Sequence, residues 1–170
     1  MSKTDSFFIR AEINAGNTNT FVQDSIDLGS YVDALGKSVL RIRNVAVKYS
    51  DADGATPDVN ANANATAQFQ ITTQSQTSLR RLDDKSVIAS GQMVAGNQTA
   101  IVGVPTVTSE SFDVSPQHFT NGYLVGVEQI YLGGQASSGF GQDCYVSVML
   151  ECTVETLSQS AAMALALSQQ

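Results

Sequence analysis

Hydrophobic and polar residues alternate along most of the chain with the two-residue period of half-buried strands. Near the N-terminus, for example, Ile9 and Ile13 share one parity and Arg10 and Glu12 share the other. The same kind of pattern, interrupted by Gly, Pro, Asn and Asp, recurs to within about 15 residues of the C-terminus. It predicts strands over residues 6–14, 20–28, 38–49, 67–78, 86–95, 98–104, 107–114, 123–132 and 143–156.

The third of these strands changes phase partway along its length. Leu40 and Ile42 are apolar at one parity, whereas Val45, Val47 and Tyr49 are apolar at the other. One extra residue restores the pattern, because a β-bulge sets two residues of one strand opposite one of its partner. We therefore predict a bulge near residues 43 and 44.

The segments between the strands predict three kinds of connection. Residues 50–66 (SDADGATPDVNANANAT) are poor in large apolar side chains and predict a long surface loop that makes contacts. Residues 133–142 (GGQASSGFGQ) predict a flexible loop, and residues 115–122 a turn or a single helical turn. The tail, residues 158–170, is rich in Ala and Leu and predicts a short C-terminal helix.

Together these elements predict the fold class. About eight strands with one short helix indicate an all-β domain over residues 1–170, an antiparallel β-sandwich of two sheets. An immunoglobulin-like sandwich is disfavoured because the chain has no Trp to complete the Cys, Trp, Cys pattern. A single jelly roll is the remaining common arrangement.

The charge balance narrows the possible partners. The 170 residues include nine Lys plus Arg against sixteen Asp plus Glu, a formal charge of −7. Nucleic-acid binding needs clustered basic residues, so we expect no direct contact with nucleic acid. An acidic excess is typical of proteins adapted to high salt, where repulsion between carboxylates is screened.

No apolar run reaches the roughly 20 residues of a membrane span, and the first residues lack a secretory signal. We therefore expect a protein that is made and kept inside a cell, or that leaves the cell by lysis.

The residues that could support catalysis do not form a recognisable motif. His118 is the only histidine, and no Gly-x-Ser-x-Gly sequence accompanies it. Two carboxylates flanking a cleft could cleave glycosides, but sequence alone does not show which ones converge. The candidates for such a pair are Glu110, Asp113, Glu128, Glu151 and Glu155. We predict that the protein is not an enzyme and needs no cofactor.

Cation binding and thiol chemistry have weak candidates. Asp51, Asp53 and Asp58 could offer carboxylates to a hard cation, but Gly54 comes too early for an EF-hand loop and no Glu closes it. A solvated acidic loop is the favoured interpretation. Cys144 and Cys152 fall on one predicted strand, about 26 Å apart, so we expect two buried free thiols.

Several residues are candidates for contacts with other subunits. An uncharged row of glutamines on one parity of residues 67–78 can hydrogen-bond to a neighbour, although a solvated sheet face is an equal alternative. The same two alternatives apply to the arginines of the third strand. The loop at 133–142 and the C-terminal tail add two apolar candidates. The full set is Gln68, Gln70, Gln74, Gln76, Arg41, Arg43, Phe140 and Leu165.

Three function classes fit an all-β domain of this size. A cupin-type enzyme needs several His ligands, and the chain has one. A carbohydrate-binding module usually presents exposed aromatic platforms, whereas this chain has no Trp and five Tyr. A structural shell subunit requires neither, and it is the favoured prediction. Carbohydrate binding stays as the alternative.

The chain as a whole resembles one family of shell proteins. The segments SFFIRAEINAGNTNTF, LRIRNVAVKY, NGYLVGVEQIYLGG and DCYVSVMLECTVE, with the Gln-rich strand between them, carry the resemblance. They are similar in size and layout to the small single jelly-roll major capsid proteins of membrane-containing icosahedral viruses. These are the sphaerolipovirus type, from haloarchaea and thermophilic bacteria. The resemblance implies a place in the virion, assembly with copies of itself, a second capsid protein in the lattice and a viral membrane beneath.

Overall fold

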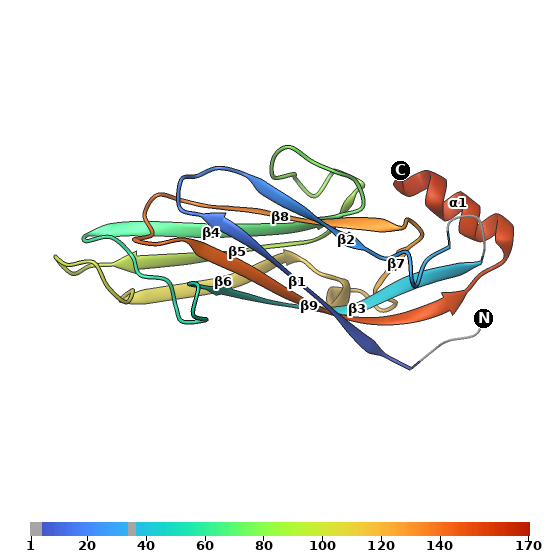
Figure 1. The fold of residues 1–170 in the computed structure, drawn as a ribbon, viewed down its shortest axis with the longest axis horizontal. Helices are drawn as coiled ribbons and strands as arrows, with labels where there is room; N and C mark the ends of the chain where they lie inside the picture. The colour runs from blue at the N-terminus through green and yellow to red at the C-terminus, as the bar shows by residue number, and fades with distance from the viewer. Residues whose placement is uncertain (1–4, 34–36) are drawn as a thin grey trace.

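Two antiparallel sheets stack face to face in the computed structural model, which describes residues 5–33 and 37–170 (Figure 1). One sheet has the order β1 (Phe7–Gly16), β9 (Cys144–Thr156), β3 (Ser38–Ser50) and β7 (Tyr123–Val125). The other has the order β2 (Val22–Asp27), β8 (Gln129–Ala136), β4 (Ala63–Thr72), β5 (Val87–Asn97) and β6 (Val107–Val114). A 3-10 turn, η1 (Pro116–His118), precedes β7, and the helix α1 (Gln159–Gln169) follows β9.

The order of pairing identifies the fold as a jelly roll. The first strand pairs with the last, β2 pairs with β8, β3 pairs with β7 and β4 pairs with β5. These nested pairs alternate between the two sheets, as in a long hairpin wrapped around a core, and β6 adds one edge strand beside β5. The predicted all-β sandwich with a short C-terminal helix is confirmed.

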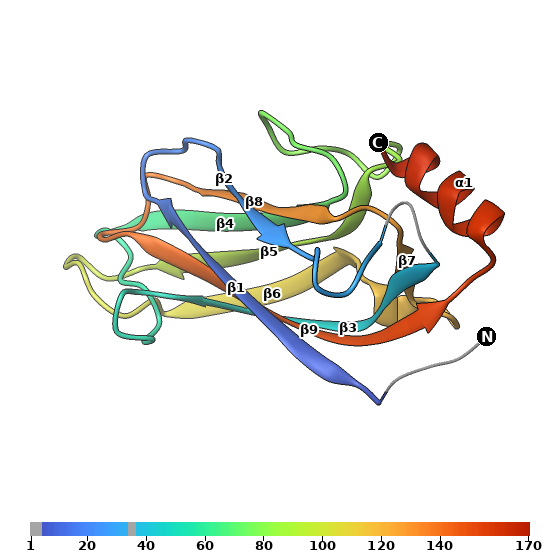
Figure 2. The same cartoon turned by 45° about the vertical axis from the view of Figure 1, so that its right-hand side comes forward.

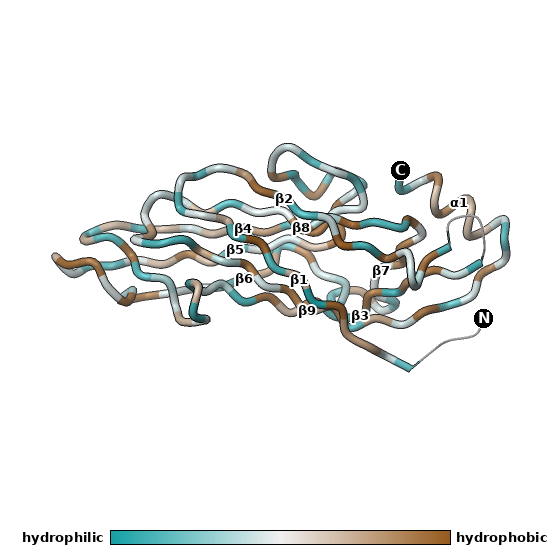
Figure 3. Tube along the Cα trace, viewed as in Figure 1, coloured by the Kyte–Doolittle hydropathy of each residue, from teal (hydrophilic) through white to brown (hydrophobic). Residues whose placement is uncertain are grey.

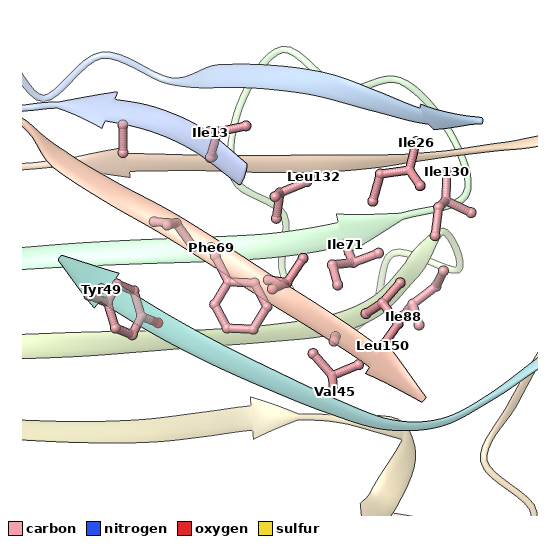
Figure 4. Close-up of a cluster of buried hydrophobic side chains, with 14 of the residues drawn as sticks. Ile13, Ile26, Val45, Tyr49, Phe69, Ile71, Ile88, Ile130, Leu132 and Leu150 are labelled. Atoms are coloured by element: carbon pink, nitrogen blue, oxygen red, sulfur yellow. The ribbon is translucent and has the colours of Figure 1, made fainter. Parts of the chain in front are cut away.

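The core lies between the sheets and is built by the period-2 pattern. Ile71, Ile130 and Leu150 are fully buried and point into the space between the two sheets (Figure 4). Phe69 lies over Gly91 of the neighbouring strand, where a Cβ atom would come within 2.8 Å of its ring. A larger residue than glycine would therefore displace the ring from the core.

The predicted bulge in β3 is confirmed. The pairing of β3 with β9 shifts between Ile42 and Asn44, so that Arg43 is the extra residue. This shift returns Val45 and Tyr49 to the buried side. The hydrophobic phase change in the sequence is thus the direct consequence of one inserted residue.

Several predicted elements are wrong. The strand predicted at 123–132 is two strands, β7 and β8, which lie in different sheets. Residues 98–104, predicted as a strand, instead form the turn between β5 and β6, with a single bridge from Val59 to Gly103. The loop predicted at 50–66 ends earlier, because β4 begins at Ala63. Residues 73–78 are not strand but the start of a connection that runs from β4 to β5 along the side of β8 and β2 (Figure 2).

The loop predicted at residues 133–142 is partly strand, because β8 continues to Ala136. Two glycines inside β8 explain the difference. A Cβ atom at Gly133 would meet the Phe21 ring at 2.6 Å, and one at Gly134 would meet the Gln68 backbone oxygen at 2.5 Å. These glycines allow close packing within a strand rather than marking a loop.

The helix α1 begins as the sequence predicts. Its N-cap is Ser158, whose side chain accepts a hydrogen bond from the backbone of Ala161. Ala162 and Ala166 are buried, while Met163 and Leu167 are exposed. None of the helices in the described ranges is both long enough and apolar enough to cross a membrane.

Candidate functional site

Four connections meet at one end of the sandwich, opposite α1 (Figure 1). They are the links β1–β2, β3–β4, β5–β6 and β8–β9, and we refer to this region as the loop end. Val59 forms bridges to both Gly103 and Phe140, which joins three of the links. The fourth is attached through Asn17, whose side-chain amide donates to the Phe140 carbonyl oxygen at 3.3 Å. The four links therefore form one connected surface.

Asn97, at the end of β5, holds the β5–β6 turn in place. It is buried, and its amide nitrogen donates to the carbonyl oxygens of Val59 at 2.9 Å and Ile101 at 2.8 Å. Its amide oxygen accepts from both the backbone nitrogen and the hydroxyl of Thr99. Both amide hydrogens and the amide oxygen are therefore used, partly within the turn and partly across to Val59 of the β3–β4 link.

This ordered turn exposes large aliphatic side chains. Ile101 is 74%, Val102 55% and Val104 73% exposed. Figure 3 shows the turn as a hydrophobic tip at the left end of the molecule. Because the backbone around them is hydrogen-bonded, their exposure is a feature of the folded state and not of a loose loop. A contiguous apolar patch of this kind is typical of a contact surface.

The acidic residues of the β3–β4 link do not converge. Asp51 closes a turn in which one carboxylate oxygen accepts from the backbone nitrogens of Ala55 and Asp53, both at 2.9 Å. These bonds, with one from Gln142, hold the pKa of Asp51 below its usual range. Within residues 5–33 and 37–170, no group of three or more His, Cys, Asp or Glu side chains is arranged to hold a metal ion, and this includes Asp53 and Asp58.

Phe140 lies at the loop end but is a core residue. Only 1% of it is exposed, and it belongs to the same buried cluster as Val59 and Phe69. As a contact residue for another subunit it was a wrong candidate, because its side chain is covered by its own chain. The burial of Phe140 could not be predicted from the sequence, because the glycines on either side of it suggest a solvated loop.

The predicted outward row of glutamines is only partly exposed. Gln70 is 1% exposed, because the β4–β5 connection covers it. Its amide donates to the Ser78 carbonyl oxygen at 3.1 Å and accepts from the Arg80 backbone nitrogen at 2.7 Å. Gln74 and Gln76 lie within that connection and are half-buried, whereas Gln68 stays on the sheet face. Gln70 is therefore a structural residue and not a surface one.

The two arginines of β3 have different surroundings. Arg41 forms an ion pair with the buried carboxylate of Glu155 on β9, and it also donates to the Asn121 carbonyl oxygen at 2.6 Å. The partner of Arg41 therefore lies within the chain, and neither predicted alternative, a contact with a neighbour or a solvated sheet face, describes this residue. Arg43 occupies the bulge and is half-buried.

The helix α1 is docked on the outer edge of β7. Leu165 packs against Gly126, where an added Cβ atom would lie 2.9 Å from the leucine side chain. Gln169 accepts from the Gly126 backbone nitrogen and donates to the Leu124 carbonyl oxygen, both at 2.7 Å. One side-chain amide thereby replaces a neighbouring strand at this edge. Sequence reasoning missed both Gln169 and Asn97, since an isolated amide gives no pattern.

The candidate nucleophiles are not activated. Cys144 and Cys152 are free and buried on β9, and burial raises the pKa of each thiol to about 12. The His118 ring nitrogen Nδ1 accepts from the Ser115 backbone within η1. Glu151 accepts from the Asn44 side chain, while Glu155 pairs with Arg41. These groups serve local structure, and their geometry provides no nucleophile with an adjacent base.

No protein-family model matches the chain, and no curated protein matches it. Among solved structures, VP1 of Trichodysplasia spinulosa-associated polyomavirus, in complex with GM1 oligosaccharide, is 8% identical with a TM-score of 0.50. The match covers 89% of this chain and 96% of that one.

Two further solved structures are similar at lower TM-scores. Desmodium yellow mottle tymovirus is 12% identical over 90% of this chain and 89% of that one, with a TM-score of 0.35. The Sulfolobus turreted icosahedral virus structure is 15% identical over 93% of this chain and 32% of that one, with a TM-score of 0.39. The VP1 comparison, at 8% identity and a TM-score of 0.50, establishes a shared fold and no more. The chain is a jelly roll of the kind found in polyomavirus VP1.

Proposed function

We propose that the protein is a structural subunit of an icosahedral viral capsid and assembles with copies of itself. The observation that carries the proposal is the ordered, exposed aliphatic turn at the loop end, formed by Ile101, Val102 and Val104. The jelly-roll fold supports it, since polyomavirus VP1, with which the fold is shared, is a viral capsid protein.

The loop end suits a contact between subunits. Exposed aliphatic side chains are unfavourable in water, and a neighbouring subunit that covers them removes this cost. The turn is already held by Asn97, so little conformational entropy is lost when it binds. In a closed symmetric shell, many such contacts of modest strength add up through multivalency.

The more specific proposal is a capsid protein of the sphaerolipovirus type. It includes a second capsid protein in the lattice and a viral membrane beneath the shell. It also includes synthesis of the protein in the cytoplasm of the host cell. The support is the resemblance of the strand sequences and the acidic composition, with eleven Asp against four Lys. The same composition supports a shell subunit that does not contact the genome directly.

The proposed role is non-catalytic. It is supported by the local structural use of the chemically interesting groups: His118 within η1, Glu155 with Arg41, and the two buried thiols. Each of these groups has a structural partner or a buried location, and neither requires a substrate.

The test is assembly of purified variants, measured by dynamic light scattering and negative-stain microscopy. We expect the double variant Ile101→Ser/Val104→Ser to fold normally but to form fewer large particles than the parent protein. Leu82→Ser is the matched control, because Leu82 is also exposed but lies on the β4–β5 connection. Equal assembly of the double variant and the control would contradict the role of the loop end. Binding of a non-assembling monomer to a glycan array would instead favour carbohydrate recognition.

A further inference from the structure

The outer face of the five-stranded sheet is divided into a covered half and an open half. The β4–β5 connection covers the first half, where Gln70 and Thr72 are buried despite pointing away from the core. The open half lies toward the loop end on β8, β4, β5 and β6. We call it the amide face, and it consists of Thr66, Gln68, Gln92, Val94, Val107, Ser109, Ser111 and Gln135.

Strand register places these residues in rows across the sheet. Gln68 of β4 is directly opposite Gln135 of β8 on one side and Gln92 of β5 on the other. Ser111 of β6 continues this row beside Gln92. Residues directly opposite each other on one face have Cβ atoms about 5 Å apart, so the row is a continuous ladder of amides and hydroxyls.

The central amides of this ladder are unused within the chain. The side chains of Gln68 and Gln92 make no hydrogen bond to any residue in the described ranges, although both are half-buried. Gln135, in contrast, donates to the Asn19 side chain at 3.2 Å. Each free amide offers two donors and an acceptor to a partner.

The amide face is also free of charge. None of its eight residues is Asp, Glu, Lys or Arg, although 25 of the 170 residues of the chain are. Val94 is 41% and Val107 57% exposed, which adds aliphatic surface beside the ladder. Depletion of charged residues is what distinguishes the buried centre of an interface from ordinary surface.

We propose that the amide face binds the same face of a second copy of this chain, in a two-fold symmetric dimer. This inference deepens the proposed function, on which it rests, by naming the surface through which two subunits meet. Primary amides are self-complementary, because each can donate to and accept from an identical group. Two identical faces can therefore satisfy one another while Val94 and Val107 become buried.

Electrostatics favours this face over the opposite one. The chain carries a net charge of −7, so two copies repel each other overall. Contact through an uncharged surface adds no like-charge pairs at close range and desolvates no charge. The outer face of the four-stranded sheet carries Arg10, Glu12, Lys48 and Glu151, whose desolvation would be costly. The amide face has no aromatic side chain for stacking against a sugar ring, and this argues for a protein partner over a glycan.

The test is a charge-pairing experiment on the dimer. The variants Gln68→Lys/Gln92→Lys and Gln68→Glu/Gln92→Glu each place like charges opposite each other across a two-fold axis. We expect each variant alone to dimerise at least about a hundredfold more weakly than the parent protein. An equimolar mixture of the two should recover the dimer, as measured by sedimentation velocity and native mass spectrometry. Recovery is specific to a face that binds itself.

Two further pairs of variants control for misfolding and for general charge effects. Ser109→Lys and Ser109→Glu place the same charges at an exposed position of the edge strand β6, and they should show the same pattern of loss and recovery. Ala46→Lys and Ala46→Glu, on the outer face of the four-stranded sheet, should leave the dimer unchanged. Unaltered dimerisation of the Gln68/Gln92 variants, or a mixture that stays monomeric, would overturn the inference.

Failure of this inference is distinguishable from failure of the proposed function. If the parent protein forms shells and the charge variants assemble and dimerise like it, the capsid proposal stands and the amide face is not the interface. If the parent protein forms the charge-sensitive dimer but never forms shells, alone or in virions, the dimer stands and the capsid proposal fails.

Discussion

At the scale of single residues, a few buried amides organise the surface. Asn97 connects the β3–β4 link to the β5–β6 turn, and Gln70 holds the middle of the β4–β5 connection. Gln169 completes the edge of β7. Each of these amides bonds to backbone groups that have no partner in the sheet ladders. Removal of one amide therefore leaves backbone groups without hydrogen bonds.

We expect Asn97→Ala to lower the free energy of unfolding by at least about 2 kcal/mol, because it leaves buried carbonyl oxygens without donors. The measurement is equilibrium urea denaturation. Asn64→Ala is the control, since Asn64 is exposed at the start of β4, and its effect should stay within about 0.5 kcal/mol. Similar stabilities for the two variants would contradict the structural role of Asn97.

The two thiols give a prediction that depends on pH. Burial raises the pKa of Cys144 and Cys152 from 9.0 to about 12, so the thiolate population at pH 8 is about a thousandfold lower than in the unfolded chain. We expect neither thiol to react with a colorimetric thiol reagent in the folded protein and both to react in urea. Rapid labelling of the folded protein would contradict their burial.

The same shift makes the folded state sensitive to alkali. Both thiols ionise at a lower pH in the unfolded chain, so their contribution to stability is present below about pH 9 and is lost as the pH rises further. Burial raises the pKa of Tyr49 as well, which acts in the same direction. The urea concentration at the midpoint of unfolding should therefore decrease when the pH is raised from 8 to 10.

At the scale of elements, sequence patterns predicted strands well and connections poorly. The alternation in β1 and the phase change in β3 follow directly from the side on which each residue is buried, so both could be predicted. The turn at 98–104 could not, because Ile101, Val102 and Val104 have strand-like preferences that tertiary hydrogen bonds from Asn97 override. Gly133 and Gly134 were misinterpreted because their role depends on Phe21 and Gln68, which are distant in sequence.

We propose that the helix α1 contributes to assembly, in addition to packing against the edge of β7. It contacts the edge of β7 through Leu165 and Gln169, and its removal exposes Gly126 and Leu124 to water that can hydrogen-bond to them. We expect a protein lacking residues 158–170 to fold as a monomer or small oligomer that forms no large particles. Circular dichroism and light scattering measure the two properties.

The control for this deletion is Gln170→Ala, which alters an exposed residue beyond the contacts with β7 and should assemble normally. Unchanged particle formation by the truncated protein would exclude a role of the tail in assembly. Loss of the folded β-sheet signal would show that α1 instead stabilises the sandwich.

At the scale of the whole molecule, the fold was predictable and the contact surfaces were not. The number of strands, the absence of alternating helices and the absence of Trp already favoured a jelly roll, and the nested pairing confirms it. The loop end and the amide face depend on which distant segments the topology brings together. Only Gln68, among the candidate glutamines, was placed on the surface that the structure leaves open.

The central claim is that this chain builds shells, and the most direct measurement is the size of the purified protein at low and at molar salt. Light scattering with negative-stain microscopy should show regular large particles, or capsomer-sized oligomers whose size depends on salt, because screening reduces repulsion between acidic subunits. A strict monomer under both conditions, which also fails to join particles when mixed with virion proteins, would contradict the account.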